Sequence, residues 1–401
     1  MMALVTTFAG SCSRGPGVPQ WLTPRGGGPF VVSLGGTHMT LPAFRAATDQ
    51  RIARLQLPTG FRLEVFARGL RNPRMMVVAP DGTAYVTRMK QGDVVMLPDR
   101  NHDGRADEAR VVASGLEQVH GIALREGLMY LATPHDVFTA AVRTDGTLSP
   151  VRRLYEAFPP GGRHPNRSLA FGPDHWLYLS TGSTCNVCVE SDPESGAMLR
   201  MRPDGGGREI FARGLRNTIG FDWEPTTGAL WGMDNGSDER GDSVPPEELN
   251  SIVANGEYGW PYCFGERTLD TRAVADLHPA SAPDCRETAG PVSLYTAHSA
   301  PMSFVFYRGT QFPEPYRHDA FITLHGSWNR SEPSGYKVVR LHFVDGRPAG
   351  FEDFLTGYFD AHEFSQFGRP MGLAVTPDGA LLVGDDANGV IYRVVWTGPA
   401  T

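Results

Sequence analysis

The sequence predicts an all-β fold, a six-bladed β-propeller whose blades are four-stranded antiparallel sheets. A hairpin pattern of two short apolar runs joined by a turn recurs at intervals of roughly 50 to 80 residues, which is typical of a repeat architecture. A second repeat supports this prediction, because VFARGLRN at 65–72 returns as IFARGLRN at 210–217. The chain also contains 47 glycines and 32 prolines, as a turn-rich fold requires. Closing such units around a channel buries both faces of each hairpin and protects the strand edges.

The expected hairpins share an outgoing apolar run, a turn and a returning run. They are expected at 75–86, 121–131, 169–179, 219–231, 303–324 and 371–383. In the third, the turn at 172–174 reads Gly-Pro-Asp, where proline presets φ and aspartate bonds its own backbone. The fifth is longer, and its run 304–306 is expected to pair with 320–322.

The composition is that of an ordinary globular protein and excludes several functions. Of the 401 residues, 41% are hydrophobic and 20% are charged. The net charge is −7 without a long basic run, so no nucleic-acid partner is expected. No apolar stretch approaches the length of a membrane span. We expect a largely irregular signal or tether region at 1–50 and one propeller domain at 51–401.

The first residues resemble an export signal. Residues 1–11 are small and apolar, and Ala9-Gly10-Ser11 precedes Cys12 as at the end of a bacterial lipoprotein signal, although the usual basic start is missing. The prediction is export to the periplasm or the cell surface, with Cys12 as a candidate lipid anchor. The alternative is an irregular N-terminus with an incidental cysteine.

Four of the five cysteines remain when Cys12 is set aside, and they form two local pairs. Cys185 and Cys188 belong to one Cys-x-x-Cys segment, and Cys263 and Cys285 lie in one long loop region. In an oxidising compartment these pairs predict two disulfides. A zinc or redox role for the first pair is the alternative, but the sequence offers neither a second Cys-x-x-Cys pair nor a βαβ context.

Imidazole and guanidinium groups recur just ahead of the outgoing apolar runs. They are His120, His164, Arg216, His298 and Arg369. A single histidine is more often structural than catalytic, but equivalent positions in successive blades converge on one face or on the channel. The set therefore favours a polyanionic ligand and a general base.

Three loops carry further candidates for binding. The acidic loop 233–250 suits a hard cation such as Ca²⁺ beside an anionic cofactor, and a solvated acidic loop is the alternative. The stretch 99–107 resembles a calcium loop, but Arg110 replaces the expected glutamate, so an Asx-rich hairpin tip is the alternative. In 325–330, Arg330 and Trp328 could stack on a planar anion, and an exposed turn is the alternative.

Several of these motifs together carry a family resemblance. They are His164 ahead of Gly-Pro-Asp at 172–174, GLRN at 214–217, DNG at 234–236 with PEELN at 246–250, YGWP at 258–261, HGSWNR at 325–330 and GRP at 368–370. Over 57–396 the chain resembles the soluble pyrroloquinoline quinone (PQQ)-dependent glucose/sorbosone dehydrogenases, and most of all the L-sorbosone dehydrogenase-like branch. The resemblance implies a six-bladed propeller that binds PQQ with Ca²⁺.

The resemblance also implies roles for individual residues. His164 matches the general base, and Arg216 matches the arginine that contacts the quinone carbonyl accepting the hydride. Asn217 follows it in the same motif, and Arg369 matches an arginine that binds a carboxylate. The remaining expected cofactor-binding residues are His120, His298 and Arg330.

The expected metal ligands come from the same comparison. The carbonyls of Gly236 and Ser237 match ligands of the cofactor's calcium, whereas Glu248 and the Tyr258 carbonyl match a structural calcium site. The family's sugar dehydrogenases have proline in place of Ser237. A lysine that the glucose-oxidising members direct at PQQ has no clear counterpart, and Asn329 or Arg330 lies nearest. His298 stands where those members have a smaller polar residue.

The predicted reaction is oxidation of an aldose or of a sorbosone-like sugar aldehyde. His164 removes the hydroxyl proton, the hydride passes to PQQ, and a quinone or a cytochrome accepts the electrons. A calcium-dependent lactonase of the propeller type is one alternative, with Glu117, Asp234 and Asp385 as metal ligands. A non-enzymatic binding propeller is the other.

Overall fold

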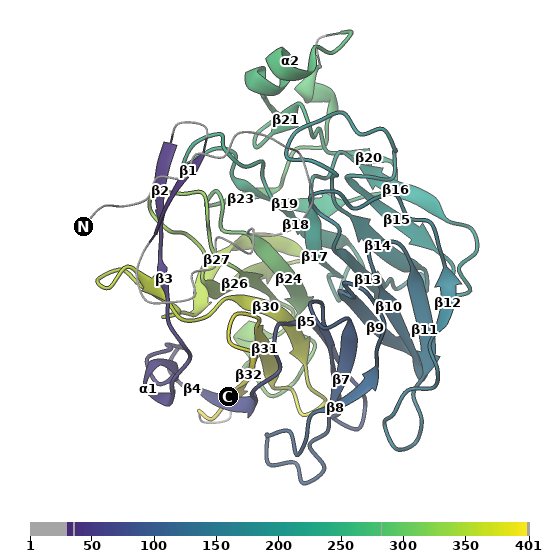
Figure 1. Cartoon of the computed structure of the whole chain (residues 1–401), viewed down its shortest axis with the longest axis vertical. Helices are drawn as coiled ribbons and strands as arrows, with labels where there is room; N and C mark the ends of the chain where they lie inside the picture. Colours follow the sequence, from purple (N-terminus) through teal and green to yellow (C-terminus); the bar gives the residue numbers. More distant parts are fainter. Residues whose placement is uncertain (1–29, 35–36, 282, 399–401) are drawn as a thin grey trace.

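The computed structural model describes residues 30–34, 37–281 and 283–398. In these residues, six antiparallel sheets of four strands, one of them extended by a fifth, surround a central axis (Figure 1). The all-β prediction and the six-bladed propeller are confirmed. The two α-helices in this part of the chain, α1 (Asp49–Ile52) and α2 (Thr271–Leu277), are short.

In each blade the strand named first lies innermost. Blade 1 consists of β5 (Pro73–Val78), β6 (Ala84–Arg88), β7 (Asp93–Leu97) and β8 (Arg110–Ala113). Blade 2 consists of β9 (Gly121–Arg125), β10 (Leu128–Ala132), β11 (Val137–Ala141) and β12 (Arg152–Tyr155). Blade 3 consists of β13 (Arg167–Phe171), β14 (Leu177–Thr181), β15 (Ala197–Met201) and β16 (Glu209–Arg213), with β20 (Gly256–Glu257) added in parallel.

The other three blades follow the same order. Blade 4 consists of β17 (Thr218–Trp223), β18 (Leu230–Asp234), β19 (Glu247–Ile252) and β23 (Ser293–Tyr295). Blade 5 consists of β24 (Pro301–Phe306), β25 (Ala320–Leu324), β26 (Lys337–Val344) and β27 (Arg347–Leu355). Blade 6 consists of β30 (Pro370–Val375), β31 (Leu381–Asp385), β32 (Val390–Trp396) and β4 (Phe61–Ala67).

The ring closes at blade 6, where β4 from the first part of the chain pairs with β32 from the last. The innermost strands contact one another in the order β5, β9, β13, β17, β24, β30 and again β5. All six predicted hairpins are therefore the inner two strands of a blade. The predicted pairing in the fifth hairpin is also correct, because Phe304 lies opposite Ile322 and Phe306 opposite Ala320.

The repeated octapeptide marks the connection from one blade to the next. Its first copy ends β4 and leads to β5, and its second ends β16 and leads to β17. The leucine of each copy, Leu70 or Leu215, is 1% exposed. Burial of this leucine, together with the outer strand that precedes it, explains why the same residues occur at both places.

The core lies between neighbouring blades. Met76 and Val86 of blade 1, for example, pack in one apolar cluster with Leu382 and Ile391 of blade 6. At some glycines, neighbouring innermost strands approach so closely that a side chain would not fit between them. A Cβ on Gly372 of β30 would lie 2.2 Å from the backbone oxygen of Arg74 in β5.

The described part of 1–50 is more regular than the sequence predicts. Strands β1 (Phe30–Leu34) and β2 (Thr37–Leu41) form a hairpin, and β3 (Ala43–Phe44) runs parallel to β29 (Ser365–Gln366). Sequence periodicity missed β3 because its partner is more than three hundred residues away along the chain. Cys12 and the expected signal at 1–11 lie outside the described residues.

A long excursion separates β19 from β23 in blade 4. It contains β20, β21 (Cys263–Phe264), β22 (Thr268–Leu269) and α2, and Figure 1 shows α2 and β21 projecting from the ring at the top of the view. Both predicted disulfides are present, Cys185–Cys188 after β14 and Cys263–Cys285 within this excursion. Among the described helices, none has the length and apolar character needed to cross a bilayer.

Candidate active site

Antiparallel pairing gathers the predicted site residues on one face of the ring. The start of an innermost strand lies opposite the end of the second strand, as Thr218 lies opposite Asp234 and Pro370 opposite Asp385. Residues just before the innermost strands, such as Arg216, therefore share this face with residues just after the second strands, such as Ser183. Their polar side chains form two networks, each around one aspartate.

The Asp238 network joins blades 3, 4 and 5. Asp238 accepts hydrogen bonds from Arg216 Nη2 at 3.2 Å, from Arg163 Nη2 at 3.3 Å and from Asn329 Nδ2 at 2.8 Å. Asn329 Nδ2 also lies 3.2 Å from His298 Nδ1, while His298 Nε2 lies 2.8 Å from the Gly241 carbonyl. Two predicted site residues, Arg216 and His298, are thus connected through Asp238 and Asn329.

Arg216 is 3% exposed, and the chain itself accepts hydrogen bonds from every nitrogen of its guanidinium. Nε donates to the Asn186 carbonyl at 3.0 Å, and Nη2 donates to Asn186 Oδ1 at 2.8 Å as well as to Asp238. Nη1 donates to the carbonyls of Asn235 at 3.1 Å and Gly236 at 2.7 Å. The guanidinium is therefore fixed in direction before any ligand binds.

His164 is partly exposed, and its tautomer is determined by its neighbours. Its Nδ1 lies 2.9 Å from the Ser183 carbonyl oxygen and 2.9 Å from Ser183 Oγ. Because a carbonyl oxygen only accepts hydrogen bonds, Nδ1 carries the hydrogen and Nε2 keeps its lone pair. Burial lowers the pKa of His164 well below its ordinary value, and the charge of Arg216 lowers it further. His164 is consequently a neutral base at physiological pH.

The Asp386 network joins blades 5, 6 and 1. Asp386 pairs with Arg74 and accepts hydrogen bonds from His325 Nε2 at 2.9 Å and Asn72 Nδ2 at 3.3 Å. Burial would raise the pKa of Asp386, but His325 and Arg74 outweigh it and hold that pKa below its ordinary value. Burial, with Arg369 nearby, lowers the pKa of His325 to about 4, so His325 donates as a neutral imidazole.

Arg369 and His120 lie beside the Asp386 network. Arg369 donates to the carbonyls of His325 at 3.0 Å and Gly326 at 2.9 Å. His120 is 0% exposed, and its Nδ1 donates to the Arg167 carbonyl at 3.2 Å. Burial and the charge of Arg74 lower the pKa of His120 to about 3.

Several buried atoms at this face lack a hydrogen-bond partner within the described residues. Three of them are His120 Nε2 and Asn72 Oδ1, which are acceptors, and Arg74 Nε, which is a donor. A buried polar atom without a partner is costly, so a ligand or a water that offers both a donor and an acceptor is expected there. An anionic cofactor with carboxylates and ring nitrogens fits these atoms and the surrounding arginines.

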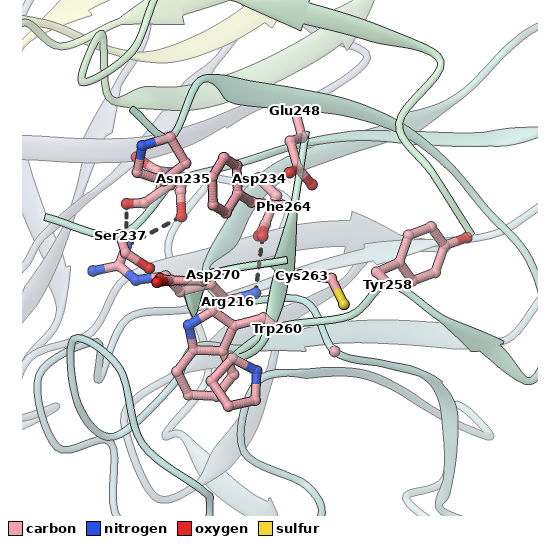
Figure 2. Close-up of a pocket in the computed structure, with 14 residues that line it drawn as sticks. Arg216, Asp234, Asn235, Ser237, Glu248, Tyr258, Trp260, Cys263, Phe264 and Asp270 are labelled. Atoms are coloured by element: carbon pink, nitrogen blue, oxygen red, sulfur yellow. Dashed lines mark hydrogen bonds between the residues drawn. The ribbon is translucent and has the colours of Figure 1, made fainter. Parts of the chain in front are cut away.

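A small cavity lies between Arg216 and the blade 4 excursion (Figure 2). Its volume is about 20 Å³, room for one water-sized occupant. The residues that line it include five of the predicted metal and cofactor residues: Arg216, Gly236, Ser237, Glu248 and Tyr258. The predicted metal residues are thus brought together at one cavity.

The carboxyl groups near this cavity have few positive charges around them, so they are hard to ionise. Burial, reinforced by Asp234, raises the pKa of Glu248 to about 8. Burial likewise raises the pKa of the adjacent Glu247 to about 8, although the N–H groups of Gly236 and Ala300 donate to it. A carboxyl group that is hard to ionise in the lining of a cavity of this size fits a hard cation, which would supply the missing charge.

Asp234 and Asp385 have a structural role that the sequence did not reveal. Asp234 accepts from the backbone N–H groups of Arg216 and Asn217, each at 2.8 Å, and Asp385 accepts from the N–H of Arg369 at 3.0 Å. Each aspartate thus holds the segment that enters the innermost strand of its own blade. Their oxygens are already bonded and Glu117 is exposed, so the metal-ligand set of the lactonase alternative is not assembled.

Arg330 is placed differently from the other predicted residues. Its side chain donates to the carbonyls of Glu332 and Asp242 and lines a separate groove that also includes Tyr295 and Phe359. Its neighbour Asn329 instead enters the Asp238 network.

Asn217, another predicted cofactor residue, is buried at 8% exposure. Its Oδ1 lies so close to Gly182 that a Cβ at Gly182 would be 2.8 Å away.

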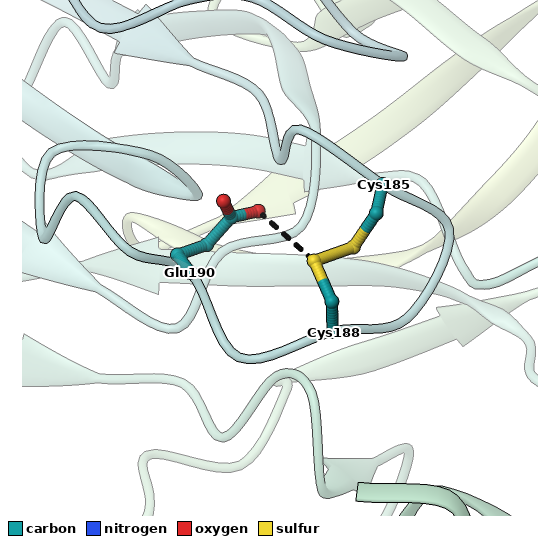
Figure 3. A group of neighbouring side chains, drawn as sticks. All are labelled: Cys185, Cys188 and Glu190. Atoms are coloured by element: carbon teal, nitrogen blue, oxygen red, sulfur yellow. Dashed lines mark hydrogen bonds between the residues drawn. A yellow bond between two sulfur atoms is a disulfide. The ribbon is translucent and has the colours of Figure 1, made fainter. Parts of the chain in front are cut away.

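The structure shows the state of two other segments for which metal binding was considered, the loop 99–107 and the pair Cys185 and Cys188. In the loop 99–107, Asp99 accepts from the N–H groups of Asp103 at 3.1 Å and Gly104 at 3.0 Å, as in an Asx-rich hairpin tip. Within the described residues, the one cluster of three metal-ligating side chains is Cys185, Cys188 and Glu190 (Figure 3). The two sulfurs are joined in a disulfide and are not available as thiolates.

Sequence reasoning missed several residues that organise the site. They are Arg74, Ser183, Asn186, Asp238 and Asp386. Ser183 and Asp386 follow second strands as regularly as the predicted residues precede innermost strands, so the hairpin pattern could have identified them. Asn186 and Asp238 lie deeper in loops and carry no such signal.

The fold and the site define a class, the six-bladed propellers that present basic and imidazole groups on one face of the ring. Comparison with known families identifies the group within that class. The TrAA12-like family model matches residues 55–397, and the chain belongs to this family.

Individual relatives agree with this assignment. The chain is 27% identical over 377 residues to an uncharacterised protein of Borreliella burgdorferi, which covers 90% of this chain and 96% of that protein. It is 24% identical to a PQQ-dependent sugar dehydrogenase of Hypocrea jecorina, over 83% of this chain and 87% of that protein. It is 23% identical to a PQQ-dependent pyranose dehydrogenase of Coprinopsis cinerea, over 85% of this chain but 54% of that protein.

Solved structures show the same fold. A Trichoderma reesei carbohydrate-active enzyme of family AA12 superposes with a TM-score of 0.73 at 21% identity, over 86% of this chain and 98% of that one. The holo PQQ domain of the Coprinopsis cinerea pyranose dehydrogenase superposes with a TM-score of 0.71 at 20% identity, over 85% of this chain and 97% of that one.

Proposed function

We propose that the protein oxidises an aldose or a sorbosone-like sugar aldehyde with PQQ as the hydride acceptor. The observation that carries the proposal is the placement of His164, whose Nδ1 is committed to Ser183 and whose Nε2 is left as a base beside Arg216. Its family and the PQQ-dependent sugar dehydrogenases among its relatives support the cofactor and the class of substrate.

PQQ, when bound, supplies an electrophilic ortho-quinone that accepts a hydride. His164 Nε2 takes the proton from the hydroxyl group of a sugar hemiacetal or an aldehyde hydrate. Arg216 stabilises the negative charge that develops nearby, and its fixed guanidinium needs no reorientation for this. The same charge keeps His164 unprotonated and ready to accept.

The remaining arginines and histidines of the face would hold the anionic cofactor. Arg369 and Arg74 suit its carboxylates, since guanidinium groups bind carboxylates through paired hydrogen bonds. His120 Nε2 would accept from a ring N–H or a water. His298 and Asn329 belong to the Asp238 network. Arg330 would contact the cofactor from the separate groove that it lines.

Two calcium ions are proposed, one of which would occupy the cavity of Figure 2, because that cavity has room for a single occupant. Gly236 and Ser237 would ligate the cofactor's calcium through carbonyl oxygens, and Glu248 with the Tyr258 carbonyl would hold a structural calcium. In this structure the Gly236 carbonyl accepts from Arg216 Nη1 at 2.7 Å. A cation at Gly236 would therefore compete for that oxygen and release one donor of Arg216 toward an anionic ligand.

Export and the electron acceptor complete the proposal. The two disulfides support an oxidising compartment, the periplasm or the cell surface, and a lipid on Cys12 remains a proposal about a residue outside the described part. A quinone or a cytochrome would accept the electrons.

Substitution of His164 tests the proposed base. We expect His164→Ala to lower kcat on an aldose panel by roughly a hundred- to ten-thousand-fold, the usual contribution of a general base, while PQQ binding is retained. Turnover with an artificial electron acceptor and PQQ absorbance measure the two quantities. Near-normal turnover in a variant that still binds PQQ would remove His164 from the mechanism.

A further inference from the structure

The loop 183–188 contacts both residues to which the proposed function assigns the chemistry. We propose that this loop, closed by the Cys185–Cys188 disulfide, is the positioning element of the site. It fixes the tautomer of His164 through Ser183, and it fixes the direction of the Arg216 guanidinium through Asn186. The inference rests on the proposed function for the roles of His164 and Arg216, and it adds how the two groups are held together.

The first connection runs from the disulfide ring to His164. Ser183 Oγ donates to the Cys185 carbonyl at 2.8 Å. Because the hydroxyl hydrogen is committed there, Ser183 Oγ acts as an acceptor toward His164 Nδ1, as does the Ser183 carbonyl. Both contacts require the hydrogen on Nδ1, so the position of Ser183, which is bonded to the disulfide ring at Cys185, decides which nitrogen of His164 is the base.

The second connection runs from the same ring to Arg216. Asn186 accepts from Arg216 twice, through its carbonyl at 3.0 Å and through Oδ1 at 2.8 Å. Asn186 also exchanges two hydrogen bonds with the backbone of Asp238, accepting from its N–H at 2.8 Å and donating to its carbonyl at 3.0 Å. One residue thus holds the guanidinium and the backbone of its carboxylate partner.

The disulfide adds to the order that hydrogen bonds give this loop. Residues 182–196, between β14 and β15, form no strand, so no ladder restrains their backbone. Ring closure over four residues removes much of that freedom, and both Cys185 and Asn186 belong to the ring. Glu190 anchors the base of the loop by accepting from Thr184 N–H at 2.7 Å and Oγ1 at 2.6 Å.

The three charged side chains that affect the pKa of His164 most are the arginines Arg216, Arg163 and Arg167, and each adds to the lowering by burial. Neither hydrogen-bond partner of Nδ1 is ionised. The tautomer of the neutral ring is therefore decided by hydrogen bonds to the loop and not by an ionised partner. A change of tautomer would therefore show that the loop has moved away from His164.

Histidine-ring NMR of the protein without PQQ tests the first connection. Long-range ¹H–¹⁵N spectra distinguish Nδ1–H from Nε2–H tautomers, and the signals missing in His164→Gln assign the residue. We expect wild type to show the Nδ1–H form. In the double variant Cys185→Ser/Cys188→Ser, we expect a mixture of tautomers at His164, while the signals of His342, on blade 5, stay unchanged. An unaltered Nδ1–H form at His164 in the folded double variant would overturn the proposal.

Asn186→Ala tests the second connection while keeping the disulfide, and Val187→Ala is its matched control within the same loop. We expect separate Arg216 Nη signals in wild type and in Val187→Ala, and merged signals in Asn186→Ala because its guanidinium rotates. Turnover of Asn186→Ala should fall roughly tenfold to a hundredfold, the effect of losing a hydrogen bond to a charged group. Separate Nη signals in Asn186→Ala would overturn the assignment. Because the NMR measurements need no PQQ, a wild type without dehydrogenase activity would defeat the proposed function and leave this test intact.

Discussion

At the scale of single residues, the choice of partner at His164 Nδ1 determines the chemistry at Nε2. The partner is the neutral Ser183, and the charge that lowers the pKa of His164 most is the cation of Arg216. Burial and this charge keep the imidazole unprotonated, although the hydrogen bond to the Ser183 carbonyl acts to raise that pKa. We therefore expect the acidic limb of the pH profile of kcat/KM to lie below the ordinary pKa of histidine, about 6.5.

Ser183→Asp should reverse this shift. A carboxylate beside Nδ1 stabilises the imidazolium, so the pKa of His164 rises and the acidic limb moves upward by about one unit or more. Ser183→Asn, which has nearly the same size without the charge, is the control and should leave the limb in place. The pH profile of kcat/KM for the three proteins measures this. An unmoved limb in Ser183→Asp would show that another group titrates.

The residue scale is also where sequence reasoning reaches its limit. Position relative to an apolar run placed His164, Arg216 and Arg369 on the correct face, because strand pairing fixes where a hairpin begins. The same reasoning could not tell Asn329 from Arg330. Adjacent side chains of a loop point in different directions, and the contact with Asp238 depends on a neighbouring blade.

At the scale of elements, the innermost strands of neighbouring blades pack backbone against backbone. Gly372 in β30 faces the backbone carbonyl of Arg74 in β5. The side chain of the same Arg74 pairs with Asp386, so this close approach lies next to the Asp386 network. Gly384, in the second strand of the same blade, has the flexible end of Met76 at 3.0 Å from its Cβ position, and the nearest backbone atoms, those of Gly372, are at ordinary contact distances of 3.5 and 3.6 Å. The two glycines therefore differ in how easily their surroundings can move.

Gly372→Ala should destabilise the fold, and Gly384→Ala should do so much less. The new methyl group of Gly372→Ala must push a backbone carbonyl away, and overpacking of this kind costs about 1–3 kcal/mol in the free energy of unfolding. Urea denaturation of the two variants and wild type measures the difference. Equal stability of the two variants would contradict the close approach of β30 to β5.

The elements themselves were predictable for a physical reason. Each hairpin carries its own signal, apolar runs bounded by turn residues, and the turn brings the runs together without help from the rest of the chain. Strands β3 and β20 carry no such signal, because each pairs in parallel with a segment far away in the sequence. Their pairing is decided by the completed ring.

At the scale of the whole molecule, buried carboxyl groups make stability depend on pH and on a cation. Burial raises the pKa of Glu247 and Glu248 to about 8, above the value near 4.3 of an unfolded chain. The folded protein therefore holds more protons than the unfolded chain between these values, and its stability falls as pH rises. The buried His120 and His325 act in the opposite direction, but below pH 6.5.

Between pH 6.5 and 8 we therefore expect the metal-free protein to lose stability with rising pH and Ca²⁺ to restore it. Ca²⁺ binds the ionised carboxylate, so its effect on Tm should grow across this interval. Glu248→Gln is the control, since it removes the buried charge and one ligand together. It should show a weaker pH dependence and a smaller response to Ca²⁺. A calcium effect on Tm that is the same at both pH values would contradict the proposed site.

The measurement that tests the central claim most directly is a titration of the metal-free protein with PQQ in the presence of Ca²⁺. The cofactor's visible and near-ultraviolet absorbance reports binding. Sorbosone and a panel of aldoses are then added as substrates. We expect tight binding, then bleaching that depends on the sugar and is lost in His164→Ala. Failure to bind PQQ with Ca²⁺ present would contradict the assignment of this face as a quinone site and of the protein as a dehydrogenase.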